Sequence, residues 1–273
     1  MKSSSIKYRL FKSHLLRYCV CILAALTAVP LLAIIGKVAV EGVRHLDWQF
    51  FTQAMPGGIA NGIVGSLLML LVASALAVPV GIGAGLFLSD HRHSKVAQAL
   101  SYLTDMLQGT PSVIIGIVVY IWVVVPSRGY SGLAGSVALF IMMLPLIVRS
   151  TEETLNMLPS SLKEAATALG GNYWRTVVHV LLPSAYGGIS TGILLAVSRV
   201  MGETAPLMFT ALGCAVIETN LARPMSAVPL LIWQFFNDPN LQSLIWSASL
   251  LLLLFVLGLN LLAKYLKHKM TVH

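Results

Sequence analysis

An arginine and a glutamate lie four residues apart in an otherwise apolar part of this sequence. Arg199 and Glu203 belong to a stretch that reads ILLAVSRVMGETAPLMF. A charged side chain at the centre of a bilayer costs about 2.5 to 3.5 kcal/mol on insertion scales, so its presence there favours a functional role. Residues four apart lie on one face of a helix. The spacing therefore predicts two charges on one helix face, near the middle of a membrane span.

Arg199 has the chemistry needed to contact an oxyanion. Its planar guanidinium offers a fork of N–H donors. We expect Glu203 to hold the guanidinium in position and to weaken its binding of the anion, because a transport pathway must release what it binds. Thr204 supplies a hydroxyl beside the glutamate, and Pro206 is expected to open the helix locally. A purely structural salt bridge between Arg199 and Glu203 is the alternative interpretation.

Arg149 is a further candidate for the substrate pathway. It falls at the end of another apolar stretch, where a guanidinium would meet an anion that leaves toward the cytoplasm. The alternative is a charge that only orients the span in the membrane. Both interpretations place Arg149 on the inner side.

A polar, helix-forming segment precedes the charged span. Ser161 stands three residues before Glu164, which is the spacing of a capping box. In that motif the hydroxyl and the carboxylate each bind a backbone N–H at the start of a helix. A short helix over residues 162–169 is predicted. Its small side chains, among them Ala165 and Ala166, would let the surface of another protein approach the backbone.

Glycine and asparagine residues indicate where this helix ends and where the next one begins. Gly170 and Gly171 permit the backbone conformation that ends a helix, and Asn172 is the predicted cap of a second helix. Pro183 is expected to stop that second helix. The segment is thus predicted to form a helix-turn-helix elbow.

The spacing of the elbow residues resembles the EAA loop of bacterial ABC importer permeases. That pattern is EAA, three residues, G, nine residues, and I-x-L-P; this chain matches it at Glu164, Ala165, Ala166, Gly170, Leu182 and Pro183, with Val180 in place of the isoleucine. GETAPL after Arg199, RSTEE from Arg149 and GTPS at residues 109–112 resemble the phosphate-import members of the family. Together these matches cover the chain from about residue 60 to its end.

The resemblance implies a fold and a set of partners. The fold would be that of a type I ABC importer permease, with six transmembrane helices and a cytoplasmic coupling helix that lies in a cleft of an ATPase subunit. The implied partners are a homologous permease subunit, a dimer of an ATP-binding subunit and an external phosphate-binding protein, with phosphate as the substrate. ATP would be bound by the partner subunit, so no cofactor is expected in this chain.

Composition independently indicates an all-α, polytopic membrane protein. Hydrophobic residues make up 57% of the chain and charged residues 10%, and the mean hydropathy is +0.83. Soluble domains are only about 45 to 50% apolar. The net charge of +8 comes from basic residues that flank apolar runs, which indicates membrane orientation and not a nucleic-acid partner.

Apolar runs predict the order of segments along the chain. Residues 1–17 form a basic, cytoplasmic N-terminal segment, and residues 18–273 form a single transmembrane permease domain. A cleaved signal peptide is the alternative for the N-terminus, but the first apolar run exceeds the usual length of about 7 to 15 residues. The predicted spans are residues 18–35, 62–88, 107–125, 133–148, 186–212 and 243–263, with an approach helix from residue 96, a cytoplasmic coupling loop at 149–183, a short helix within the loop 213–241 and a basic tail at 264–273.

The distribution of Lys and Arg predicts which side of the membrane each loop occupies. With both termini in the cytoplasm, the inner segments hold 13 of the 18 basic residues and the outer loops hold 3, namely Arg44, Arg128 and Arg223. Inner loops normally carry the excess of Lys and Arg. The predicted location is the bacterial cytoplasmic (inner) membrane, with the elbow facing the cytoplasm.

Several other functions are weighed against phosphate import. The chain has no G-x-x-x-x-G-K-[ST] phosphate loop, so it is expected to be a transport subunit and not an ATPase. His91 and His93 have no partners at metal-ligand spacing, and no metal site is expected. The remaining alternatives are a permease for sulfate, molybdate or tungstate, the homologous partner permease, an ATP-independent secondary transporter, and a structural or signalling membrane subunit.

Overall fold

Helices account for all the regular elements in residues 3–271, the part of the 273-residue chain that this computed structural model describes. One isolated backbone bridge joins Leu212 and Met225. The helices are α1 (Ser3–Arg44), α2 (Trp48–Thr52), α3 (Ala60–Asp90), α4 (Lys95–Gly109), α5 (Ser112–Val119), α6 (Val125–Ser127), α7 (Gly132–Met157), α8 (Ser160–Ala168), α9 (Tyr173–Thr176), α10 (Leu182–Val200), α11 (Ala205–Thr210), α12 (Val228–Asn237) and α13 (Gln242–Thr271), with π-helical segments η1 (Tyr120–Val124) and η2 (Val177–Leu181).

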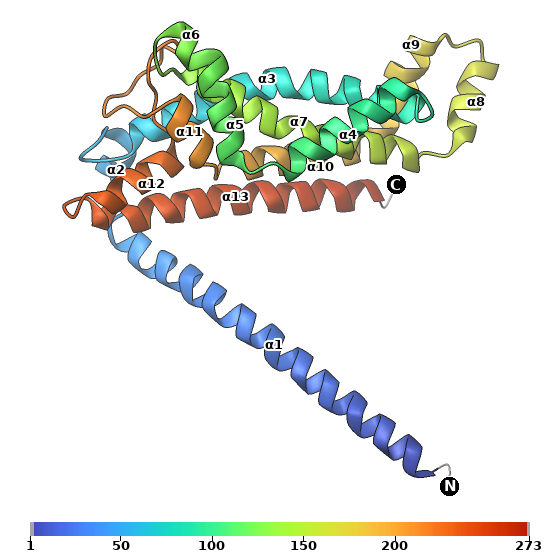
Figure 1. The fold of residues 1–273 in the computed structure, drawn as a ribbon, viewed down its shortest axis with the longest axis horizontal. Helices are drawn as coiled ribbons and strands as arrows, with labels where there is room; N and C mark the ends of the chain where they lie inside the picture. Colours follow the sequence, from blue (N-terminus) through green and yellow to red (C-terminus); the bar gives the residue numbers. More distant parts are fainter. Residues whose placement is uncertain (1–2, 272–273) are drawn as a thin grey trace.

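The centre of the molecule is a bundle of long helices. α3, α7, α10 and α13 run side by side along its length, and α8 and α9 lie together at one end (Figure 1). Met69, Ala73, Met143, Ala196 and Val200 belong to the apolar core between these helices. The all-helical prediction is confirmed.

The predicted number of spans agrees with the helices observed. Five helices are long and apolar enough to cross a membrane, and the number becomes six if α4 and the helix from Ser112 to Ser127 form one bent span. These two parts meet at an angle of 106° around Thr110 and Pro111. The helix therefore restarts after this proline, and the second part begins at Ser112 and not at residue 107, where the predicted span began.

α7 and α10 approach closely because small residues line their contact. A Cβ atom at Gly192 would lie 1.9 Å from Ser150 Oγ, and one at Gly188 would lie 2.2 Å from Thr154 Oγ1. The Ser150 hydroxyl donates a hydrogen bond of 3.1 Å to the Gly188 carbonyl. Helices in lipid associate through such small-residue contacts, because hydrophobic burial no longer drives them together.

α1 leaves the bundle at an angle and contacts it only near its C-terminal end (Figure 1). There the Ser247 hydroxyl donates to the Gly42 carbonyl at 2.8 Å, and the Lys37 ammonium lies 4.8 Å from the centre of the Trp246 ring. The apolar side chains of α1 over residues 16–35 are exposed, for example Leu26 and Leu32. Such a surface is suited to lipid or to another membrane subunit.

The fifth span differs from its prediction at both ends. Pro183 does not stop the second elbow helix; α9, η2 and α10 form one continuous helix from Tyr173 to Val200. The Leu182 N–H bonds to the Val177 carbonyl, five residues back, so the wider π-helical turn accommodates the proline that follows. At the other end, the helix predicted to reach residue 212 ends at Val200.

Candidate functional site

Three of the four candidate pathway residues, Arg199, Glu203 and Thr204, lie where a long apolar helix breaks. α10 ends at Val200, residues 201–204 form an irregular turn, and α11 begins at Ala205. Arg199 is in the last turn of α10, while Glu203 lies in the irregular segment and Thr204 caps α11. The prediction that Arg199 and Glu203 share one helix face is therefore wrong. Pro206 stands near the start of α11, where its missing N–H costs no helical bond.

Contacts place this break deep in the bundle. Val200 and Met201 line a small space with Leu70 and Leu139. Leu70 lies ten residues inside the first residue of α3, which is about 15 Å along a helix. The hydrocarbon core of a bilayer is about 30 Å thick. The depth of Arg199 near the middle of the membrane stays a prediction.

The polar groups at the break are open to the surroundings of the chain. Arg199 and Gly202 are exposed, and Glu203 and Thr204 are partly buried. Across residues 3–271, the ion pairs and hydrogen bonds include none made by the side chains of Arg199, Glu203 or Thr204. The alternative of a structural Arg199–Glu203 salt bridge is therefore not observed. The guanidinium is available to an external ligand.

The backbone at the break is also incompletely paired. The N–H groups of Gly202 and Glu203 bond back to Arg199 and Val200, but within the described chain no N–H reaches the carbonyls of Met201, Gly202 and Glu203. Irregular backbone at membrane depth is tolerated only where it is buried in protein or lines a water-filled cavity. The break is therefore suited to a subunit seam or an aqueous passage.

Arg149 lies in a different setting, at the contact between α7 and α4. Its Nε donates to Asp105 Oδ1 at 3.0 Å, and one terminal nitrogen donates to Glu152 at 2.7 Å. The other terminal nitrogen contacts both the carbonyl and the hydroxyl of Ser101. Sequence reasoning missed Asp105, because 44 residues separate it from Arg149 and only the fold brings them together. Glu152 lies three residues after Arg149 on the same helix, a spacing that could have indicated the pair. A role for Arg149 in substrate exit stays a prediction.

The elbow has the predicted turn but not the predicted start. Gly170 has a φ of +79°, a conformation that favours glycine, and Asn172 Oδ1 accepts a hydrogen bond from the Arg175 N–H at 2.9 Å. α8 begins at Ser160 after Pro159 without a side-chain cap, so the capping box of Ser161 and Glu164 is not formed. Pro159 takes the place of the predicted cap: its ring fixes φ near −65°, and it has an extended backbone just before the helix.

The first elbow helix presents its side chains to solvent. α8 buries none of them; Glu164 and Ala165 are exposed, Ala166 is partly buried, and Leu169 is 90% exposed. An exposed leucine beside small residues is suited to contact another protein. Pro183 and Leu182, the last residues of the predicted coupling motif, lie at the start of α10 and outside α8.

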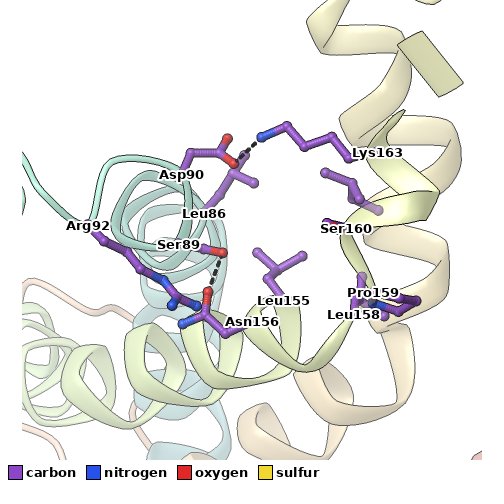
Figure 2. A pocket seen from close by; sticks show the side chains of 11 residues that line it. Leu86, Ser89, Asp90, Arg92, Leu155, Asn156, Leu158, Pro159, Ser160 and Lys163 are labelled. Atoms are coloured by element: carbon purple, nitrogen blue, oxygen red, sulfur yellow. Dashed lines mark hydrogen bonds and ion pairs between the residues drawn. The ribbon is translucent and has the colours of Figure 1, made fainter. Parts of the chain in front are cut away.

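A carboxylate that the sequence did not mark joins the elbow to the bundle. Asp90, the last residue of α3, accepts hydrogen bonds from Lys163 of α8 at 2.7 Å and from the Tyr173 hydroxyl of α9. Beside it the Ser89 hydroxyl donates to Asn156 of α7 at 2.7 Å (Figure 2). The only sequence signal was the position of Asp90 at the end of an apolar run.

Comparison with known proteins identifies the family. A model described as "Binding-protein-dependent transport system inner membrane component" matches residues 77–272. The chain belongs to this family. It is 39% identical to the phosphate transport system permease protein PstA of Yersinia pestis, over 86% of this chain and 82% of the relative. It is 38% identical to PstA of Pasteurella multocida, over 82% and 83% of the two chains.

Solved structures agree with the fold. Two structures of the MetNI methionine ABC transporter in inward-facing conformations match with TM-scores of 0.63 and 0.64 at 20% identity, and the match covers 78% of this chain and 95% of each matched chain. The protein has the type I ABC importer permease fold. As a member of this permease family, it is a multi-pass membrane component of a transport system.

Proposed function

We propose that this chain is one of the two membrane subunits of an ATP-driven importer of inorganic phosphate. The helix break beside Arg199 carries the proposal, because an exposed guanidinium and backbone carbonyls without a partner in the described chain lie together within an apolar, membrane-type segment. A guanidinium binds phosphate oxygens through paired N–H donors. The names of the relatives support phosphate over sulfate, molybdate or tungstate, and PstA over its homologous partner.

The proposed assembly supplies what this chain lacks. A PstC-like permease would close the other side of the pathway at the break, and an external PstS-like protein would deliver phosphate. Two copies of a PstB-like subunit would bind and hydrolyse ATP, so this chain would hold no cofactor and would not itself be an enzyme. α8, through Glu164, Ala165, Ala166 and Gly170, would contact that ATPase in the cytoplasm.

Transport would link the elbow to the break through one helix. The continuous helix from Tyr173 to Val200 starts at the elbow and ends beside Arg199. ATP-driven closure of the ATPase subunits would move α8, and rigid-body movement of the helices would open the pathway to one side and then to the other. Glu203 and Thr204, in the irregular segment after α10, would contact the anion together with Arg199 and shorten the time that the anion stays bound.

Replacement of Arg199 tests the proposal. In proteoliposomes that contain the whole complex, we expect Arg199→Ala to reduce ATP-dependent uptake of labelled phosphate by about tenfold or more, since a charged hydrogen bond contributes about 1.5 to 3 kcal/mol. Assembly should remain intact, because none of the side chains that the structure describes is bonded to Arg199. Arg44→Ala is the matched control, since it removes an exposed arginine near the end of α1.

Other outcomes would contradict the assignment. Normal phosphate uptake by the Arg199→Ala complex would remove Arg199 from the pathway, and loss of assembly would favour a structural role. Uptake of sulfate or molybdate by the unmodified complex, without uptake of phosphate, would replace the proposed substrate. Uptake that continues without ATP would favour a secondary transporter.

A further inference from the structure

We propose that Asp90 positions the coupling elbow and transmits its movement to the membrane helices. This inference rests on the proposed function, because it assigns α8 to the contact with the ATPase. Asp90 has one carboxylate oxygen for each arm of the elbow. Its Oδ1 accepts from Lys163 of α8 at 2.7 Å, and its Oδ2 accepts from the Tyr173 hydroxyl of α9. We call these three residues the elbow latch.

The elbow has few other attachments to the bundle. α8 buries no side chain, and its main contacts are with α9 and η2, which follow it in the chain. The ion pair between Lys163 and Asp90 therefore links α8 to a helix of the bundle across 73 residues of sequence. Only 11% of the Asp90 side chain is exposed, against 47% of Lys163, so the carboxylate is the fixed member of the pair.

Asp90 is placed where movement of the elbow would reach two membrane helices. It is the last residue of α3, and Ser89 beside it is hydrogen-bonded to Asn156 of α7 (Figure 2). Further along the same pair of helices, Gly85 faces Thr151 at close range. A displacement of the α3 terminus would therefore be shared with α7.

The second arm of the latch, Tyr173, belongs to the helix that carries the candidate pathway arginine. Tyr173 is the first residue of the continuous helix that ends at Val200, one residue beyond Arg199. A single carboxylate thus contacts both the coupling helix and the base of the helix that carries the pathway arginine. Rotation of α8 that strained one hydrogen bond would change the other through the same carboxylate.

The surroundings of the latch leave room for movement. A cavity of about 270 Å³ lies between α3, α7 and α8, and its lining includes Leu86, Leu155, Leu158 and Lys163 (Figure 2). This space is open to the surface, and close-packed elements move between discrete arrangements and do not deform continuously. The cavity allows α8 to move toward the bundle while Asp90 holds one side of it.

Three single replacements separate the arms of the latch. Asp90→Asn removes the negative charge and with it the ion pair to Lys163, although the amide can still accept from Lys163 and donate to the Tyr173 hydroxyl oxygen. Lys163→Met removes the α8 arm, and Tyr173→Phe removes the α9 arm. Lys95→Met is the matched control, because Lys95 is an exposed cytoplasmic-side lysine at the start of α4, outside the latch.

Two measurements on the whole complex test the proposal. The first is the number of phosphate ions taken up per ATP hydrolysed; we expect Asp90→Asn and Lys163→Met to lower this ratio by about fivefold or more, the usual lower range of coupling between sites. The second is the spin-label distance between cysteines introduced at Ala168 and Met157, with the native cysteines replaced. The distance distribution should broaden in the latch variants and stay unchanged in Lys95→Met.

Exchange of the two charges, Asp90→Lys with Lys163→Asp, should restore both measurements in part. Unchanged ratios and unchanged distance distributions in all three latch variants would overturn the proposal, as would equal effects in Lys95→Met. The distance measurement needs no phosphate. A complex that hydrolyses ATP but carries no phosphate would therefore disprove the proposed substrate, and the spin-label distances alone would then decide whether the latch exists.

Discussion

Arg149 and Arg199 show two opposite uses of an arginine in one membrane protein. Arg149 directs its donors to Asp105, Glu152 and Ser101 within the chain. Arg199 directs none of its donors to a side chain or backbone group in residues 3–271. A guanidinium whose N–H donors are bonded within the chain stabilises a contact between helices. A guanidinium whose donors are not bonded there is available to a ligand.

Replacement of Arg149 should therefore reduce stability more than it reduces phosphate affinity. Its removal leaves Glu152, with a side chain only 16% exposed, without its cation. We expect Arg149→Ala to cost about 1 to 3 kcal/mol, below the value for a fully buried pair because Asp105 is exposed. The measurement is the thermal midpoint of the purified complex, together with the KM for phosphate uptake. Arg92→Ala, which removes an exposed arginine, is the control.

The opposite pattern would restore the pathway interpretation of Arg149. A raised KM with an unchanged thermal midpoint would show that this arginine contacts the substrate and not the fold. A lowered midpoint with an unchanged KM is the result that its hydrogen bonds lead us to expect.

At the scale of residues, the sequence indicated which charged residues are unusual but not which partners they have. Charged residues are costly within a membrane span, so Arg199 and Glu203 stood out in an apolar stretch of the sequence. Asp90 carried no such signal, because an acidic residue at the end of a span is also explained by contact with water. Its two partners come from positions 73 and 83 residues away, and only tertiary structure brings them together.

At the scale of elements, the contact between α7 and α10 depends on the absence of two side chains. We expect Gly192→Ala to destabilise the complex by about 1 to 3 kcal/mol, the usual cost of overpacking. The reason is that the new methyl group would lie 2.2 Å from Ser150 Cβ. The thermal midpoint of the purified complex measures this effect.

A glycine in an open place is the control for that replacement. No atom lies within 4 Å of a Cβ atom built on Gly83 of α3, so Gly83→Ala should leave the midpoint unchanged or raise it slightly. Ser150→Gly should partly rescue Gly192→Ala, since it removes the opposing side chain. A Gly192→Ala complex as stable as the Gly83→Ala complex would show that the helices can separate at no cost.

At this scale, helices could be predicted where the length of an apolar run determines their bounds. They could not be predicted where a proline or a break in the helix determines them. The spans of α3 and α13 follow from their apolar runs. Pro183 looked like a helix stop, yet the π-helical turn η2 before it supplies the space that its ring needs. The same arrangement recurs where η1 precedes Pro126. The packing around the proline determines whether the chain forms a π-helical turn or ends its helix. A hydropathy pattern carries no information about that packing.

At the scale of the whole molecule, the orientation of the chain is the main untested prediction. α13 ends at the same end of the bundle as α8 and α9 (Figure 1). The excess of basic residues predicts that this end faces the cytoplasm. We expect a cysteine at Ala168 to react with a membrane-impermeant maleimide only in inverted vesicles, and a cysteine at Thr219 only in intact cells stripped of their outer membrane.

The native cysteines would be replaced for this labelling experiment, and a chain without cysteine is the control. Reaction at Ala168 from the outer side would reverse the topology and would also remove the elbow from the reach of a cytoplasmic ATPase. The basic residues of the N-terminal segment and the tail, on this result, would need another explanation.

The unpaired carbonyls of Met201, Gly202 and Glu203 have a consequence for biogenesis. A lone copy of this subunit, newly inserted by the translocation machinery, would expose those groups to hydrocarbon. A neighbouring subunit or a chain of water molecules would shield them, since each unsatisfied backbone group costs several kcal/mol in hydrocarbon. We therefore expect the lone subunit to be less stable in the bilayer than the assembled one, so that its accumulation depends on the supply of its partner.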